Sequence, residues 1–194
     1  LDLFSGIGGF SLGLQQAGIE PDWIGYSDTD KYCNEVFKRN FQNAEELGSI
    51  TDIQPEKLPN IDLITFGFPC QDLSVGGKRG GLHADRSGLF FKAIEIVNAK
   101  KPKYFIFENV KGLFSSSKGQ DFKIVLQNIA DIGYDGQWQL CNTRHFGLPQ
   151  NRERIYFIGH IRGEDRPKVF PIRKGNKKIR KTQGKSNDTQ CIRT

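Results

Sequence analysis

Apolar positions along the chain alternate between short continuous runs and segments where they recur every three or four residues. Continuous runs are typical of buried strands, whereas the wider spacing is typical of amphipathic helices. The runs predict strands at Leu1–Phe4, Trp23–Ser27, a short stretch closed by Gly48–Thr51, Ile61–Phe66 and Tyr104–Phe107. Strands that alternate with helices in this way favour a parallel sheet.

The helical segments follow these strands, and each carries one apolar face. The residues on these faces are Phe10, Leu14 and Ala17; Cys33, Val36, Phe37 and Phe41; Leu89, Phe90, Ala93, Ile94 and Val97; and Phe122, Val125, Leu126 and Ile129. No helical pattern separates the last two strands, Gln137–Cys141 and Arg154–His160, so they should pair in antiparallel fashion. The pattern predicts an α/β fold with a doubly wound, mostly parallel sheet and a late antiparallel hairpin.

Composition places the chain among globular proteins and indicates one domain of 194 residues with 37% hydrophobic side chains. No apolar run approaches the roughly 20 residues of a membrane helix. The four cysteines form no C-x-x-C pair, which argues against a zinc ribbon or a disulfide scaffold and favours a reducing compartment. We therefore expect a cytoplasmic, monomeric protein without metal. The absence of Met and of a signal peptide indicates an excised piece.

Positive charge is concentrated at the C-terminal end of the chain. Residues 161–194 hold 11 basic and 3 acidic side chains, whereas residues 1–160 hold 17 basic and 19 acidic ones. Such a segment suits contact with nucleic-acid phosphates, but a solvated end is an equally good interpretation.

A glycine-rich segment, Phe4–Gly9, joins the first predicted strand to the first helix, where open α/β sheets bind nucleotides. Position 11 is Ser11, whereas the dinucleotide fingerprint would need a glycine there. Asp28 follows Gly8 by 20 residues and ends the second strand, where a carboxylate can bind both hydroxyls of a ribose. The pattern favours a nucleoside cofactor without pyrophosphate, with a simple tight turn as the alternative.

Cys70 is a candidate nucleophile because it follows a buried strand and Pro69 and opens a glycine-rich loop. Cys33 and Cys141 lie in a helix face and a strand, so we interpret them as small core residues; Cys191 has no informative context.

Charged residues follow two other strands. Glu108 comes after the Tyr104–Phe107 strand and should reach the same sheet edge as Cys70, although a solvated acid is the common alternative. Arg152 and Arg154 would share one face if their strand had already begun. Two guanidinium groups on one face would suit an anion or a carbonyl group. The alternative is that they merely shield an edge strand.

Together these blocks resemble the C5-cytosine DNA methyltransferases. The matching segments are Asp2–Gly9, Asp28–Tyr32, Pro69-Cys70-Gln71, Asp85–Phe90, Glu108-Asn109-Val110 and Gln150-x-Arg152-x-Arg154, in the order of the family. The resemblance implies a Rossmann-like methyltransferase fold, S-adenosylmethionine as cofactor, duplex DNA as partner and a role in restriction-modification. It covers roughly residues 1–160, the predicted catalytic domain, and makes residues 161–194 the start of a target-recognition region that is otherwise absent.

The resemblance also implies a role for individual residues. The implied catalytic residues are Cys70, Glu108, Arg152 and Arg154. The implied cofactor-binding residues are Phe4, Ser5, Gly6, Ile7, Gly8, Gly9, Asp28, Thr29, Ser49, Ile50, Pro69 and Leu89. The implied substrate-binding residues are Pro69, Gln71, Ser74, Lys78, Arg79 and Asn109. The sequence departs from the family at Asp28, where a Glu is usual, at Thr29, often a large apolar residue, and at Ser49, often an Asp.

Three alternatives stay open at the level of sequence. An RNA-cytosine methyltransferase would use the same blocks. The target-recognition segment would distinguish the two enzymes, and that segment is missing here. A non-catalytic DNA-binding module is disfavoured by the presence of Cys70 and Glu108. A nucleotide-dependent dehydrogenase is disfavoured by Ser11 and by the lack of an obvious hydride-site His.

Overall fold

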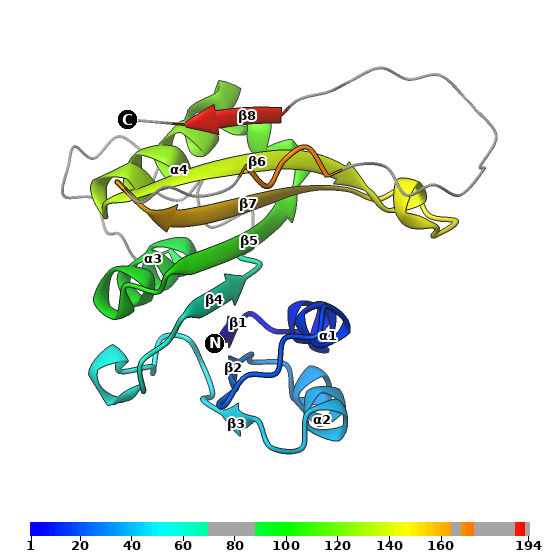
Figure 1. Cartoon of the computed structure of the whole chain (residues 1–194), viewed down its shortest axis with the longest axis vertical. Coiled ribbons are helices and arrows are strands. Elements are labelled where there is room, and N and C mark those ends of the chain that lie inside the picture. The colour runs from blue at the N-terminus through cyan, green and yellow to red at the C-terminus, as the bar shows by residue number, and fades with distance from the viewer. Residues whose placement is uncertain (70–87, 164–167, 173–188, 193–194) are drawn as a thin grey trace. The chain divides into compact units, whose positions relative to one another are not determined.

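The computed structural model describes residues 1–69, 88–163, 168–172 and 189–192. The chain divides into two compact units, Leu1–Phe107 and Glu108–Thr194, which are described separately below (Figure 1). The predicted division at residue 160 separates a catalytic domain from the start of a target-recognition region. It stays a prediction.

The first unit contains a parallel sheet. Its strands are β1 (Asp2–Leu3), β2 (Gly25–Ser27), β3 (Glu45–Glu46), β4 (Leu63–Phe66) and the first residues of β5 (Tyr104–Val110). They lie in the order β3-β2-β1-β4-β5, and every neighbouring pair is parallel (Figure 1). The predicted parallel sheet is therefore confirmed.

The third strand lies upstream of its predicted position. The backbone N–H groups of Glu45 and Leu47 donate to the carbonyls of Ile24 and Tyr26, which defines β3. Gly48 then takes a left-handed φ of 71°, so the chain turns away where the strand was expected to close. The prediction for Gly48–Thr51 was wrong because the true strand consists of two exposed glutamates and carries no apolar signal.

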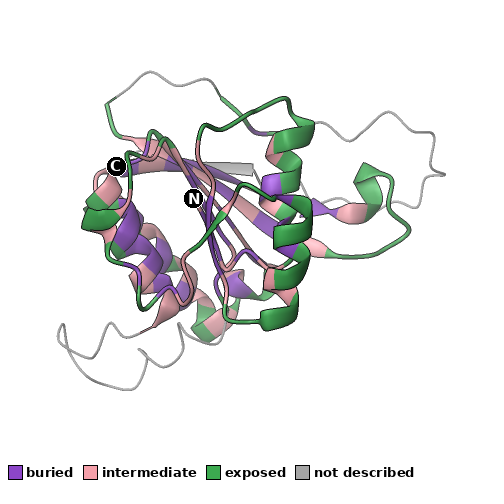
Figure 2. Cartoon of the chain, turned by 90° about the horizontal axis from the view of Figure 1, so that it is seen from below, coloured by how far each residue is buried: buried purple, intermediate pink, exposed green. Residues whose placement is uncertain are grey.

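The helices of the first unit are α1 (Gly9–Gln16), α2 (Lys31–Asn40), the 3-10 helix η1 (Pro55–Lys57) and α3 (Leu89–Lys100). The side chain of Asp30 caps α2 by accepting from the backbone N–H groups of Tyr32 and Cys33. On the predicted apolar face of α2 only Phe37 is fully buried, and Val36 is exposed. Strands are largely buried, while the helices keep exposed outer faces (Figure 2).

The second unit is built on an antiparallel hairpin. After the end of β5 come η4 (Lys111–Phe114), η5 (Ser116–Gly119), α4 (Gln120–Asp131), β6 (Tyr134–Asn142), η6 (Thr143–Phe146), β7 (Glu153–Ile161) and β8 (Thr189–Ile192). β6 pairs with β7 in antiparallel fashion along its whole length, which confirms the predicted hairpin. β8 pairs with the same strand, also antiparallel.

Part of the basic C-terminal segment packs against β6. Phe170 is 2% exposed, and its backbone N–H and that of Val169 both donate to Oε1 of Gln137. The backbone N–H of Ile172 donates to Oε1 of Gln139 at 2.7 Å. Two glutamine amides thus hold residues 168–172 on the strand.

Candidate functional site

The glycine-rich segment forms a tight left-handed turn between β1 and α1. Phe4, Gly6 and Gly8 have φ values of 54°, 52° and 91°. The backbone N–H of Gly8 donates to the carbonyl of Ser5 at 2.9 Å, which closes the turn. Residues other than glycine rarely adopt such angles, so the spacing of the glycines follows from the shape of the turn.

The glycines of this turn differ in what surrounds them. A Cβ atom on Gly6 or Gly9 would meet nothing within 4 Å, so the backbone there faces open space. A Cβ atom on Gly8 would lie 2.6 Å from the ring of Phe41. Gly8 therefore allows the turn to pack on α2, whereas Gly6 and Gly9 leave room for a ligand to approach the backbone.

Ser5 carries an unused hydroxyl inside this turn. Its side chain is 7% exposed, and Oγ has no hydrogen-bond partner within the described part of the chain. Its backbone is held, because the N–H donates to the carbonyl of Ser27 at 3.1 Å. A buried polar atom without a partner is unfavourable, so this hydroxyl has an unused capacity for a hydrogen bond.

Asp28 connects the end of β2 to the turn. Its Oδ2 accepts from the backbone N–H of Gly6 at 2.8 Å, and its Oδ1 accepts from that of Asp30 at 2.9 Å. Each carboxylate oxygen can accept a second hydrogen bond. The carboxylate is thus oriented beside the open backbone of the turn, and its predicted contact with a ribose stays a prediction.

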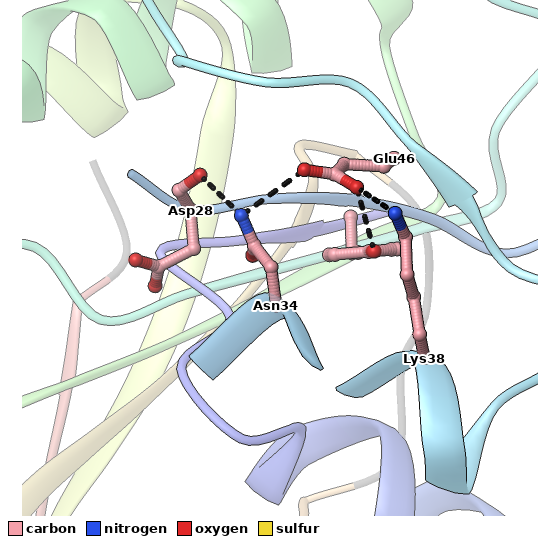
Figure 3. Close-up of polar contacts among 5 residues, drawn as sticks. Asp28, Asn34, Lys38 and Glu46 are labelled. Atoms are coloured by element: carbon pink, nitrogen blue, oxygen red, sulfur yellow. Dashed lines mark hydrogen bonds and ion pairs between the residues drawn. The ribbon is translucent and has the colours of Figure 1, made fainter. Parts of the chain in front are cut away.

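A polar network behind Asp28 was not foreseen from the sequence (Figure 3). Nδ2 of Asn34 donates to the carbonyl of Asp28 at 3.2 Å and to Oε1 of Glu46 at 3.1 Å. Nζ of Lys38 and the hydroxyl of Tyr26 bind Oε2 of Glu46. The hydrogen bond from Lys38 holds the pKa of Glu46 below its ordinary value. This network fixes the backbone at Asp28.

A second unforeseen contact lies below the turn. Oδ2 of Asp2 accepts from Oγ of Ser11, and Oδ1 accepts from Oγ1 of Thr65, both at 2.8 Å. Burial raises the pKa of Asp2 to about 6, and these hydrogen bonds partly offset the rise. The only sequence signal was a charged residue inside an otherwise apolar strand.

The other predicted cofactor residues differ in their burial and local contacts. Ile7 and Thr29 are exposed, Ile50 is buried, Leu89 begins α3 and Pro69 is exposed. The hydroxyl of Ser49 forms a local hydrogen bond with the hydroxyl of Thr51, at 2.7 Å. The binding roles of these residues stay predictions.

In the second unit, Glu108 forms an ion pair with Arg154. Nε of Arg154 lies 2.6 Å from Oε1 of Glu108, and the two side chains are 20% and 24% exposed. Glu108 lies inside β5, which runs to Val110, and not after it as predicted. Because the pairing with β4 ends at Phe107, Glu108 is still the first residue beyond that pairing. A neighbour, Asn109, is buried.

Arg152 lies just before the strand that carries Arg154, because β7 begins at Glu153. The shared face of the two arginines was expected only if the strand had already begun at Arg152, so it stays a prediction. The backbone of Arg152 bonds to Thr143 across the hairpin. On β7, burial raises the pKa of Tyr156, and the charge of Glu108 raises it further.

Several predicted residues lie outside the described part of the chain: Cys70, Gln71, Ser74, Lys78 and Arg79. Cys191 lies in β8, opposite Gln137 of β6. Of the other cysteines, Cys141 is buried as predicted, and burial raises the pKa of its thiol. Cys33 is only half-buried, because it lies near the exposed start of α2, so its assignment to the core was wrong.

The described part of the chain contains neither a membrane-spanning helix nor a metal-binding cluster. None of the helices found there is long and apolar enough to cross a membrane. Within the same residues, His, Cys, Asp and Glu side chains nowhere gather in a group of three that could hold a metal ion.

Comparison with known proteins gives a consistent picture. A family model described as C-5 cytosine-specific DNA methylase matches residues 1–193. The type II methyltransferase M.NgoBI of Neisseria gonorrhoeae is 42% identical over 171 residues, covering 88% of this chain and 52% of that protein. The orphan methyltransferase M.Rho11sI of Bacillus phage rho11s is 42% identical over 162 residues, covering 82% of this chain and 32% of that protein. The chain thus spans about half or less of these relatives.

The solved structures show the same fold at lower sequence identity. A crystal structure of DNMT2 from Spodoptera frugiperda matches with a TM-score of 0.65 at 23% identity, covering 91% of this chain and 53% of that one. A structure of Dnmt2 methyltransferase from S. pombe matches with a TM-score of 0.64, also at 23% identity, covering 87% and 50%.

Proposed function

Because the chain belongs to the family of C-5 cytosine-specific DNA methylases, we propose that it is the catalytic part of a DNA (cytosine-5)-methyltransferase. Its fold is that of the Rossmann-like methyltransferases. The reaction would transfer a methyl group from S-adenosylmethionine to C5 of a cytosine flipped out of duplex DNA. The observation that carries the proposal is the open glycine turn, tied to Asp28 and holding an unpartnered Ser5 hydroxyl.

The residues of the turn fit a nucleoside cofactor. The carboxylate of Asp28 is already oriented by Gly6 and Asp30 and would accept from the ribose hydroxyls. The open backbone at Gly6 and Gly9 and the hydroxyl of Ser5 would contact the rest of the cofactor. When bound, S-adenosylmethionine supplies an electrophilic methyl group. Thr29, Ser49, Ile50, Pro69 and Leu89 complete the proposed binding set, with Phe4, Ile7 and Gly8.

The proposed chemistry begins at Cys70, which we assign from its motif. Cytosine C5 is a weak nucleophile, so the Cys70 thiolate adds to C6 and gives C5 enamine character. Glu108 in its acid form donates its proton to N3 and accepts from the exocyclic amine, which neutralises the charge that moves onto the ring. After C5 accepts the methyl group, loss of the C5 proton and elimination of Cys70 restore the aromatic ring.

Arg154 has a direct part in this scheme because it already binds Glu108 at 2.6 Å. A guanidinium at that distance keeps a carboxylate in one orientation while leaving its second oxygen to the base. Arg152 is proposed as a second contact to the flipped nucleotide.

Duplex DNA is the proposed substrate, and base flipping is required because C6 lies inside the stack. Pro69, Gln71, Ser74, Lys78, Arg79 and Asn109 are proposed to contact it. We further propose a monomer that needs no metal and acts in the cytoplasm, on nucleoid DNA in a bacterial cell.

The test is covalent trapping of the full-length protein on duplex DNA that carries 5-fluorocytosine. Fluorine cannot leave as the C5 proton does, so the enzyme should remain bound to its target. Cys70→Ser should abolish the complex, and the matched variants Cys33→Ser and Cys141→Ser should not. A complex formed by Cys70→Ser at the parent rate would overturn the assignment. Trapping on the equivalent RNA and not on DNA would favour the RNA methyltransferase, and binding without trapping would favour a non-catalytic module.

A further inference from the structure

A buried aspartate lies directly before the glycine turn and takes no part in the proposed chemistry. Asp2 is 3% exposed, so its carboxylate is closed off from the space beside Gly6 and Gly9. Its two oxygens accept hydrogen bonds from Ser11 on α1 and Thr65 on β4. One carboxylate therefore joins β1, α1 and β4.

The hydrogen bond between Asp2 and Ser11 spans the whole turn. Asp2 lies two residues before Phe4, and Ser11 lies two residues after Gly9. The residues between them include three with left-handed φ values, which form no regular ladder of backbone hydrogen bonds. The shape of such a segment depends on how its two ends are held, and this bond holds them together.

The carboxylate also supplies what α1 lacks at its start. The N-cap of α1 is Gly8, which has no side chain to accept a hydrogen bond, and the first turn contains no acidic residue. Ser11 is the one buried residue of α1 within the described structure and the third residue of the helix. A negative charge at this position is favourable for the helix, and Asp2 provides it from the neighbouring strand.

We propose that Asp2 is a positioning residue for S-adenosylmethionine, acting through the hydroxyls of Ser11 and Thr65. The three side chains fix where α1 begins relative to β1 and β4, and this in turn fixes the open backbone at Gly6 and Gly9 and the direction of the Ser5 hydroxyl. The inference rests on the proposed function, because it names the same cofactor.

The position of Ser11 supports this role. In the dinucleotide fingerprint a glycine at the equivalent place lets helix and strand pack closely. Here a buried serine occupies it, and close approach is instead secured by a hydrogen bond to the strand.

The experiment measures S-adenosylmethionine binding by calorimetry in the full-length protein. Ser11→Ala and Thr65→Val each remove one hydroxyl with little change in volume, and each should raise the Kd about 5- to 10-fold, near the value of one ordinary intramolecular hydrogen bond. The KM for the cofactor should rise by the same factor, while kcat at saturating cofactor changes less than about 2-fold. Ser11→Thr and Thr65→Ser keep the hydroxyl and should restore affinity.

The second unit offers a matched control. Asp121 is 2% exposed and accepts from the hydroxyls of Ser116 and Ser117 at 2.5 and 3.1 Å. Ser116→Ala removes a comparable bond to a buried aspartate, so it should lower the Tm but leave the Kd for S-adenosylmethionine unchanged.

The outcomes separate three conclusions. If Ser11→Ala and Thr65→Val lower the Tm as Ser116→Ala does but leave the Kd unchanged, Asp2 is merely structural and the inference fails. If one of the two does not fold, the other still decides. If the parent protein binds no S-adenosylmethionine, the proposed function fails instead.

Discussion

Asp2 in the first unit and Glu108 in the second are both carboxylates in strands, yet their surroundings differ in kind. Asp2 is 3% exposed and accepts from neutral hydroxyls, whereas Glu108 is 24% exposed and pairs with the guanidinium of Arg154. A carboxylate that no ligand can reach can only shape the protein around it. A carboxylate that is oriented but still accessible can take part in a reaction. Under the proposed function, Asp2 affects the affinity for the cofactor and Glu108 affects the rate of methyl transfer.

The largest expected effect is at Glu108. Glu108→Gln keeps the size of the side chain but weakens its interaction with N3, so methyl transfer should slow by about 10²- to 10⁴-fold. Affinity for S-adenosylmethionine should not change, which single-turnover kinetics beside calorimetry would establish. Glu153→Gln is the matched control, because Glu153 pairs with Lys111 at the surface. A loss of cofactor affinity in Glu108→Gln would break the comparison.

The next effect concerns the pH dependence of stability at Asp2. Burial raises its pKa from 3.8 to about 6, so the folded protein binds this proton more tightly than the unfolded chain does. The resulting stabilisation is present below pH 4 and is lost as pH rises through about 6. Relative to Asp2→Asn, the wild type should lose about 3 kcal/mol of unfolding free energy across this range. Urea unfolding at several pH values measures the difference, and a constant difference contradicts the prediction.

A smaller effect is expected at Asp28. Asp28→Ala removes the proposed ribose contact and the bond to Gly6, so the Kd for S-adenosylmethionine should rise about 10-fold, as expected for a lost bond to a charged group. Calorimetry on Asp28→Ala and on Asp62→Ala, an exposed aspartate paired with Lys103, makes the comparison. If Asp28→Ala, Asp62→Ala and the parent protein bind S-adenosylmethionine with equal affinity, Asp28 is not part of the cofactor site.

The smallest effect is expected at Lys38, on the outer side of the network in Figure 3. Lys38 pairs with Glu46 at the surface, where solvent weakens ion pairs, so Lys38→Gln should change the Kd less than about 2-fold. A loss of tenfold or more would mean that the whole network, and not Asp28 alone, sets affinity.

The sequence predicted those features whose signal is local. The glycine turn, the helices and the hairpin each depend on residues close together in the chain, and all lie where the pattern indicated. Asp28 was found because its distance from the glycines follows from one strand–helix–strand unit. The extension of β5 through Glu108 was missed because charged Glu108 and polar Asn109 interrupt its apolar pattern.

Features that depend on distant partners were not predictable. β3 is defined by backbone bonds from Glu45 and Leu47 to the neighbouring strand, so its two side chains carry no pattern. Asp2 and Thr65 are 63 residues apart, and neither residue type indicates the other. The sequence indicated Glu108 at a sheet edge and Arg154 in a strand. Nothing in the sequence indicated that the two side chains form an ion pair.

The placement of β1 between β2 and β4 has a consequence for biosynthesis. A ribosome releases β1 before β4, so one edge of β1 stays unpaired until β4 follows some 60 residues later in the chain. At synthesis rates of about 5–20 residues per second, this leaves an interval of several seconds. The glycine turn that follows β1 cannot reach its final geometry during that interval, because Thr65, which holds Asp2, has not yet emerged.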